Sequence, residues 1–154
     1  EQFARARLRE GEFLKADLIQ KLDGMLAGVD FITERSPVIV EEYRQNLRNK
    51  VKELLEDTQV DEGRLLMEVT IYADKVCVDE ELVRLRSHIS AVRQTLETGA
   101  DQNGIGRKLD FLAQEMNREA NTTLSKSSDL EISNRAIDLK TDVEKVREQI
   151  QNIE

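Results

Sequence analysis

The chain contains one cysteine, one proline and no tryptophan, and aromatic residues make up only 4% of its 154 residues. The single thiol, Cys77, excludes an internal disulfide and a thiolate zinc cluster, and it suits a reducing compartment such as the cytoplasm. A β-sandwich or a barrel needs more turn residues and more β-branched runs than this chain offers. No stretch approaches the ~20 apolar residues of a membrane span. These absences predict an all-α protein.

Charged residues make up 35% of the chain, and 31 acidic against 23 basic residues give a formal net charge of −8. This balance argues against a simple duplex-DNA binder, whose domain is normally basic. Hydrophobic residues make up 39% of the chain and recur every three to four positions, which is too many and too regular for a disordered chain. We therefore expect an elongated helical bundle of about six helices with coiled-coil-like seams.

The proline marks the clearest expected helix boundary. The first helix is predicted to end near Thr33, because Ser36 can cap a second helix and Pro37 fits its first turn. Later helices have three predicted caps: Asp61, Asp79 and Ser128. The last helix carries apolar residues at alternating spacings of four and three, from Ile132 to Ile153. Such a seam needs a partner, either inside the fold or in another subunit.

Glycine divides the chain into two expected parts. Residues 1–98 are predicted to form helical hairpins within a bundle, and residues 107–154 a polar helix followed by the seam helix. Between them, residues 99–106 hold three glycines and read as a hinge. The chain begins without Met and already in helical register, so we expect a preceding N-terminal domain to be absent.

The helix expected from Arg107 concentrates Asn, Thr, Ser and Gln, although the first three are mediocre helix formers. Helical spacing puts five polar side chains near one line: Arg107, Gln114, Arg118, Asn121 and Ser125. Beside them, Glu115 and Glu119 stand at i and i+4 and can direct two carboxylates at one point. Hard oxygen ligands so placed suit Mg²⁺ or Mn²⁺. Surface ion pairs among Glu115, Arg118 and Glu119 are the alternative.

His88 is the only histidine, and it shares a helix face with Glu81 and Arg84. Histidine suits proton transfer near neutral pH and metal binding. A half-buried histidine with a hydrogen-bonded ring is the alternative. Cys77 follows an apolar residue and has no clear cationic neighbour, so we expect it to pack rather than to react.

Four stretches of the chain resemble one family. They are GRKLDFLAQEMNREANTTLSK from Gly106 to Lys126, VREQIQNIE at the end, ELVRLRSH from Glu81 to His88, and the early GEFLKADL. Together they resemble the C-terminal domain of the bacterial YicC family. The resemblance implies a cytoplasmic, metal-dependent endoribonuclease that acts in RNA turnover on single-stranded or structured RNA. It also implies assembly as a ring-like hexamer and a further N-terminal domain.

The resemblance places the polar helix in the family's motif and implies a mechanism. We expect an RNA phosphodiester to be hydrolysed at a Mn²⁺ or Mg²⁺ ion held by Glu115 and Glu119, with His88 and Glu81 completing the site or moving protons. The implied RNA contacts are Arg84, Arg107, Gln114, Asn117, Arg118, Asn121, Ser125 and Lys126. This site requires His88 to face Glu115.

Two other functions remain open from the sequence. The chain is alternatively a helical oligomerisation or RNA-positioning module, with the chemistry in the absent N-terminal domain. A coiled-coil adaptor without RNA contact is the third possibility, and it predicts no salt-sensitive RNA binding.

Overall fold

A computed structural model describes residues 1–56, 59–98 and 104–153. These residues form five helices and no strand. The helices are α1 (Gln2–Leu55), α2 (Glu62–Val76), α3 (Asp79–Thr98), α4 (Ile105–Lys126) and α5 (Leu130–Ile153). The all-α prediction is confirmed, whereas the count of about six helices is wrong.

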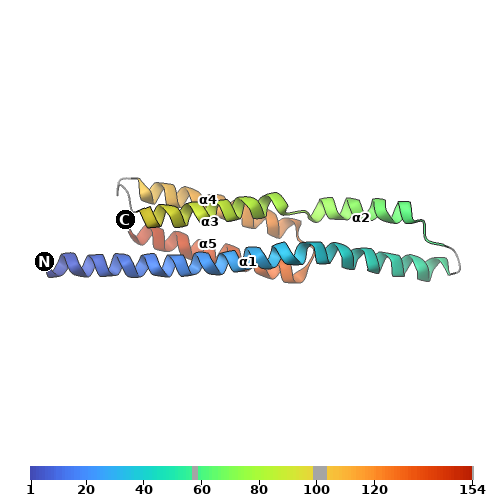
Figure 1. Cartoon of the computed structure of the whole chain (residues 1–154), viewed down its shortest axis with the longest axis horizontal. Helices are drawn as coiled ribbons and strands as arrows, with labels where there is room; N and C mark the ends of the chain where they lie inside the picture. Colours follow the sequence, from blue (N-terminus) through green and yellow to red (C-terminus); the bar gives the residue numbers. More distant parts are fainter. Residues whose placement is uncertain (57–58, 99–103, 154) are drawn as a thin grey trace.

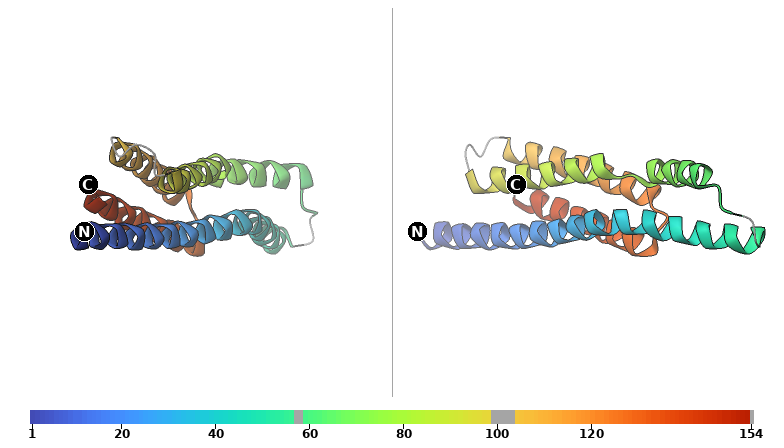
Figure 2. Two further views of the ribbon diagram at one scale, coloured as in Figure 1. Left: turned by 60° about the vertical axis from the view of Figure 1, so that its left-hand side comes forward. Right: turned by 45° about the vertical axis from the view of Figure 1, so that its right-hand side comes forward.

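Four of the helices share one bundle (Figure 1). α3 packs against α1 and α4, and α5 packs against α4 and α1, so the helices close into a ring of antiparallel neighbours. α2 and the C-terminal half of α1 continue beyond this bundle as a two-helix arm, which Figure 2 shows from two further sides. Both predicted parts of the chain, residues 1–98 and 107–154, contribute helices to the bundle.

The expected helix boundary at Pro37 is wrong, because α1 runs through it without a break. Pro37 lacks a backbone N–H, and a proline in the interior of a helix lowers the stability of that helix by about 3 kcal/mol. Ile32 and Ile39 are both buried on either side of it, and Ser36 donates its hydroxyl to the Ile32 carbonyl at 2.7 Å instead of capping a new helix. Packing on both sides therefore holds α1 continuous.

The core lies inside the four-helix ring. Its largest fully buried side chains are Leu18, Leu22, Met25, Ile32, Leu85, Ile89, Leu109, Met116, Leu139 and Ile150. The predicted seam of α5 is buried from Ile132 to Ile150, and the side chain of Ile153 lies outside the described residues. The seam's partners are thus α1 and α4 of the same chain.

The helix caps match the sequence prediction in one of three cases. Asp61 caps α2, since its carboxylate accepts from the Arg64 backbone N–H at 3.2 Å. Asp79 is already the first residue of α3, which begins with a bond from the Leu82 N–H to the carbonyl of the residue before Asp79. Ser128 does not cap α5. Asp129 does, and it accepts from the Ile132 N–H at 3.1 Å.

One tyrosine contact holds the arm together and a second ties it to the bundle. Tyr43 of α1 and Tyr72 of α2 stack with ring centroids 3.8 Å apart. The Tyr72 hydroxyl also shares a hydrogen bond of 2.7 Å with the Ser128 hydroxyl in the α4–α5 connection. These contacts set the end of α2, and so the start of α3, close to the end of α4.

Most of the predicted hinge at 99–106 lies outside the described residues. Gly104 precedes α4 with φ of 102°, a left-handed conformation that glycine adopts without steric penalty. The next residues, Ile105 and Gly106, already belong to α4. Among the helices described, none is long and apolar enough to cross a membrane.

Gly24→Ala is expected to stabilise the protein by about 0.5–1 kcal/mol, because alanine restricts the unfolded chain and favours the helix. A Cβ at Gly24 meets nothing within 4 Å. Thermal unfolding followed by circular dichroism measures the change. Gly28→Ala is the matched comparison, since its Cβ would lie 3.6 Å from the Leu139 side chain and its gain depends on that contact. An unchanged or lower melting temperature in Gly24→Ala contradicts the prediction.

Candidate active site

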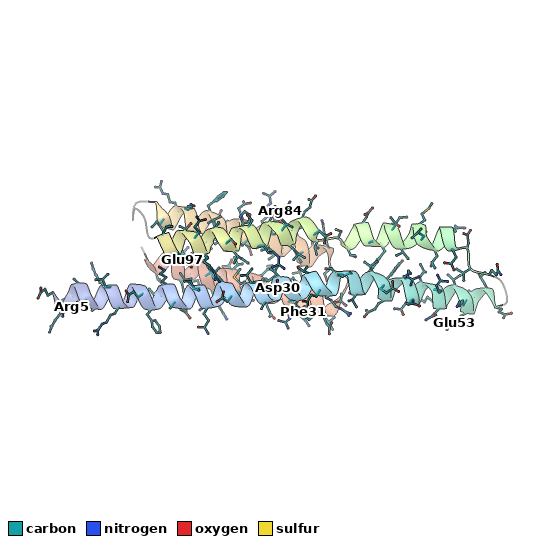
Figure 3. All side chains as sticks on the ribbon, viewed as in Figure 1. Arg5, Asp30, Phe31, Glu53, Arg84 and Glu97 are labelled. Carbon is teal, nitrogen blue, oxygen red and sulfur yellow. The ribbon has the colours of Figure 1, made fainter. Side chains whose placement is uncertain are left out.

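α3 and α4 run antiparallel and bring four predicted site residues together. Glu81 and Arg84 come from the first turns of α3, and Glu119 and Lys126 from the second half of α4. We call these four residues the charged cluster. Figure 3 labels Arg84 near the start of α3, beside the break that separates it from α2.

The first ion pair of the charged cluster crosses from α3 to α4. Lys126 Nζ donates to Glu81 Oε1 at 2.8 Å and also lies 3.3 Å from the Cys77 carbonyl oxygen. Glu81 is 4% exposed, whereas the Lys126 side chain is 38% exposed. The second oxygen, Glu81 Oε2, is buried and has no hydrogen-bond partner within the part of the chain that the structure describes. Glu81 is therefore a carboxylate held in the protein mainly by one lysine.

The second ion pair crosses the same helix contact in the opposite sense. Arg84 Nε on α3 donates to Glu119 Oε1 on α4 at 2.8 Å. Glu119 is 6% exposed, while the Arg84 side chain is 46% exposed and also lies 3.8 Å from Glu81 Oε1. Both carboxylates of the charged cluster are thus buried, and both cations reach solvent.

The charges of the cluster support one another. Burial opposes ionisation of Glu81, but the hydrogen bond from Lys126 and the charges of Lys126 and Arg84 outweigh it and hold the pKa of Glu81 below its usual value. The hydrogen bond to Glu119 raises the pKa of Arg84, and the bond to Glu81 raises the pKa of Lys126. Glu81, Arg84 and Lys126 are therefore charged at neutral pH.

His88 and Glu115 lie one helical turn from the Arg84–Glu119 ion pair, along the contact between α3 and α4. His88 follows Arg84 by one turn on α3, and Glu115 precedes Glu119 by one turn on α4, so the antiparallel register sets the two half-buried residues toward each other. Neither makes an ion pair with another described residue. That His88 faces Glu115 stays a prediction, which this register favours.

The expected metal ligands do not fit a metal centre as they are arranged. Within residues 1–56, 59–98 and 104–153, no three His, Cys, Asp or Glu side chains come together in a way that could hold an ion. Glu81 and Glu119 instead bind Lys126 and Arg84. Their carboxylates are already neutralised by side chains of the protein.

The solvent face of α4 forms a second feature, which we call the outer stripe. Its members recur at helical spacing and are all exposed: Arg107, Phe111, Gln114, Arg118, Asn121 and Ser125. No carboxylate of a described residue lies within ion-pair distance of the Arg107 or Arg118 side chain. The outer stripe runs beside the flank that carries Glu115, Glu119 and Lys126.

Comparison with known proteins decides the family. The model of the family "Endoribonuclease YicC-like, C-terminal" matches residues 32–154. The chain belongs to the YicC-like endoribonuclease family. The resemblance seen in the sequence is thereby confirmed.

Two curated relatives of the YicC-like family support the match. The chain is 46% identical to a "Probable endoribonuclease YicC" of Clostridioides difficile over 96% of its own length and 50% of the relative's. It is 38% identical to a protein of the same name from Haemophilus influenzae, over 99% of its own length and 51% of the relative's. The chain thus spans about half the length of the curated relatives it matches.

The YicC-like motif stretch from Gly106 to Lys126 is almost all of α4. Its implied RNA contacts separate in the structure. Arg107, Gln114, Arg118, Asn121 and Ser125 lie on the outer stripe, and Lys126 lies in the charged cluster with Arg84. Asn117 is half-buried on the side of α4 toward α5, where Asp110 pairs with Arg147, so it borders the outer stripe on the flank opposite the charged cluster.

Two residues differ from their expected roles in this YicC-like chain. Cys77 is exposed rather than packed, because it sits in the break between α2 and α3. Phe111 was not expected at the site, since an apolar residue at helical spacing normally belongs to the core. Its position four residues after Arg107 and three before Gln114 is the signal that places it on the polar side of the helix.

Proposed function

We propose that this chain is part of an endoribonuclease and that RNA is cleaved over the α3–α4 contact, where the charged cluster borders the outer stripe. The observation that carries this proposal is the pair of buried carboxylates whose cations, Arg84 and Lys126, reach solvent. Perturbed, interlocked charges of this kind gather at functional sites. The names of the relatives from Clostridioides and Haemophilus support RNA as the substrate. The cytoplasmic location and the hexameric assembly implied by the resemblance stay predictions.

Each part of the α3–α4 contact has a distinct chemical task. The outward ends of Arg84 and Lys126 neutralise the charge that builds on a phosphoryl oxygen as the phosphodiester breaks. Glu81 and Glu119 fix these two cations in place before the substrate arrives, so little reorganisation is needed. His88 moves a proton to or from the reacting oxygen. Arg107 and Arg118 hold the neighbouring phosphates.

We also propose that cleavage needs a divalent ion. This proposal stands apart from the residue roles above, because Glu81 and Glu119 are engaged by Lys126 and Arg84 and so do not serve as its ligands in this arrangement. Mn²⁺ and Mg²⁺ prefer oxygen ligands, and Glu115 is the carboxylate on this flank without an ion-pair partner among the described residues. No step of the mechanism above passes through a metal.

The test is an RNA cleavage assay with the 154-residue chain, a labelled RNA, and Mn²⁺, Mg²⁺ or a chelator. We expect cleavage with one of the ions and its loss in the chelator. Glu119→Gln is expected to slow cleavage about tenfold or more, since Arg84 loses the charge that positions it. Absence of cleavage under every condition contradicts the proposed function of this chain.

The control for Glu119→Gln is Glu41→Gln. Glu41 pairs with Arg44 on α1, at 2.7 Å, and neither residue belongs to α3 or α4. It removes an ion pair of the same chemistry without touching the α3–α4 contact. We expect cleavage by Glu41→Gln to equal that of the wild type.

RNA cleavage that proceeds in the presence of the chelator overturns only the proposed requirement for a divalent ion.

A further inference from the structure

Phe111 is an isolated aromatic side chain on a polar face. It is 59% exposed, and no other large hydrophobic residue of α4 is exposed in the described residues. Along the outer stripe its neighbours are Arg107 and Gln114, and Arg118 follows two turns later. A protein partner normally covers a contiguous apolar patch, and a single ring between polar side chains does not form one. The ring therefore favours a ligand that itself alternates flat apolar and charged groups.

The cations beside Phe111 differ from the other arginines of α3, α4 and α5. On α3, α4 and α5 the remaining arginines all contact a carboxylate or a ring of a described residue: Arg84, Arg86, Arg93, Arg135 and Arg147. Arg107 and Arg118 have no such partner within the described part of the chain. In a protein with net charge −8, acidic side chains are abundant. Two arginines of the outer stripe without an acidic partner among the described residues therefore favour an anionic ligand.

A nucleic-acid strand provides both kinds of group. Its phosphates match the two guanidinium groups, which lie about 6 Å and 10 Å along the helix from Phe111 by the helical rise. Its bases stack on exposed aromatic rings irrespective of sequence. In a duplex both faces of a base are already stacked, so only an unpaired nucleotide can present one to the ring.

We propose that Phe111 is a stacking platform that makes this site select unpaired RNA nucleotides. This inference rests on the proposed function, because the platform lies on the same helix, α4, as Glu119 and Lys126 of the charged cluster that would cleave the strand. A nucleotide stacked on Phe111 orients the strand so that its following nucleotides run along α4 toward the charged cluster, whose Glu119 and Lys126 lie about 12 Å and 22 Å farther along the helix by its rise. Phe111 thus acts on substrate selection rather than on the chemical step.

The test measures RNA binding in a chelator by fluorescence anisotropy, using the 154-residue chain and a labelled strand of about 12 nucleotides, alone or annealed to its complement. Phe111→Ala is expected to weaken binding of the single strand about 5- to 100-fold and to leave duplex binding unchanged. Phe111→Trp is expected to retain strand binding, whereas Phe111→Leu behaves as Phe111→Ala. The exposure of Phe111 predicts normal folding of each variant, which circular dichroism checks.

Phe13→Ala is the control, since Phe13 is 77% exposed on α1 and far from α4 along the chain. The platform is overturned if Phe111→Ala binds the strand as the wild type does, if Phe111→Leu restores binding, or if the wild type binds no strand at all. If RNA cleavage fails while Phe111-dependent strand binding remains, the proposed function is wrong and the platform stands. If cleavage proceeds with an unchanged KM in Phe111→Ala, only the platform is wrong.

Discussion

Lys126→Met is expected to lower the free energy of unfolding by about 2–4 kcal/mol at pH 7, because it leaves a buried carboxylate without its main partner. Lys126 supplies the 2.8 Å hydrogen bond to Glu81 Oε1, and Glu81 Oε2 already has no partner among the described residues. Arg84, at 3.8 Å from Glu81 and engaged with Glu119, replaces that bond only weakly. Urea unfolding at pH 7 measures the loss.

The same variant is expected to change the pH dependence of stability. In the wild type the pKa of Glu81 is lowered, so its stabilising contribution is full above the unfolded pKa near 4.5 and is lost as the pH falls through the folded value. Without Lys126, burial dominates and raises the pKa of Glu81. Its protonation then relieves the folded state as the pH falls. The stability difference between the two proteins should therefore be largest near pH 7 and shrink toward pH 4.5.

Lys21→Met is the matched control for Lys126→Met. Lys21 also forms a 2.7 Å ion pair, with Asp17, but that carboxylate is 35% exposed and water can replace the lysine. A much smaller loss with little pH dependence is expected. Equal losses in the two variants, or a loss in Lys126→Met that is constant with pH, would show that burial of Glu81 does not matter.

The helical class and the buried seams follow from residue spacing, because a stripe at three and four positions has to face an apolar neighbour. The spacing from Leu82 to Val92 and from Ile132 to Ile150 identifies residues that are buried in the structure. Local chemistry at Pro37 misled the prediction of the first helix. The missing N–H is a local penalty, while the burial of Ile32 and Ile39 on one continuous helix depends on the other helices packed against α1, which the local sequence does not reveal.

The candidate site was predictable by residue type but not by pairing. Helical spacing identified Glu81, Arg84 and His88 as one face and Glu119 as the neighbour of Glu115, and the resemblance to the YicC-like family added Lys126. The choice of partners depends on the register between α3 and α4, which sets Glu81 against a lysine 45 residues away. That register turns two expected metal ligands into members of ion pairs. The exposure of Phe111, in contrast, could have been predicted from its spacing, since it lies four residues after Arg107 and three before Gln114 on the polar side of α4.

His88→Gln is expected to lower kcat for RNA cleavage about 10²- to 10⁴-fold, the contribution of a positioned proton-transfer group. Glutamine keeps a similar polar shape but does not exchange a proton near neutral pH. His88 is half-buried and makes no hydrogen bond or ion pair with a described residue, so the substitution leaves no partner unsatisfied. We therefore expect unchanged unfolding and unchanged RNA binding, and a loss confined to the chemical step.

The pH dependence of cleavage makes this prediction specific. His88 is the only histidine in the chain, so a limb of the pH–rate profile that disappears in His88→Gln belongs to this residue. Ser87→Ala changes the neighbouring exposed residue of α3 and should leave both the rate and the profile as in the wild type. A His88→Gln protein that cleaves RNA at the wild-type rate would assign the histidine to packing, and the proton transfer would then belong to a carboxylate such as Glu115 on the opposite helix.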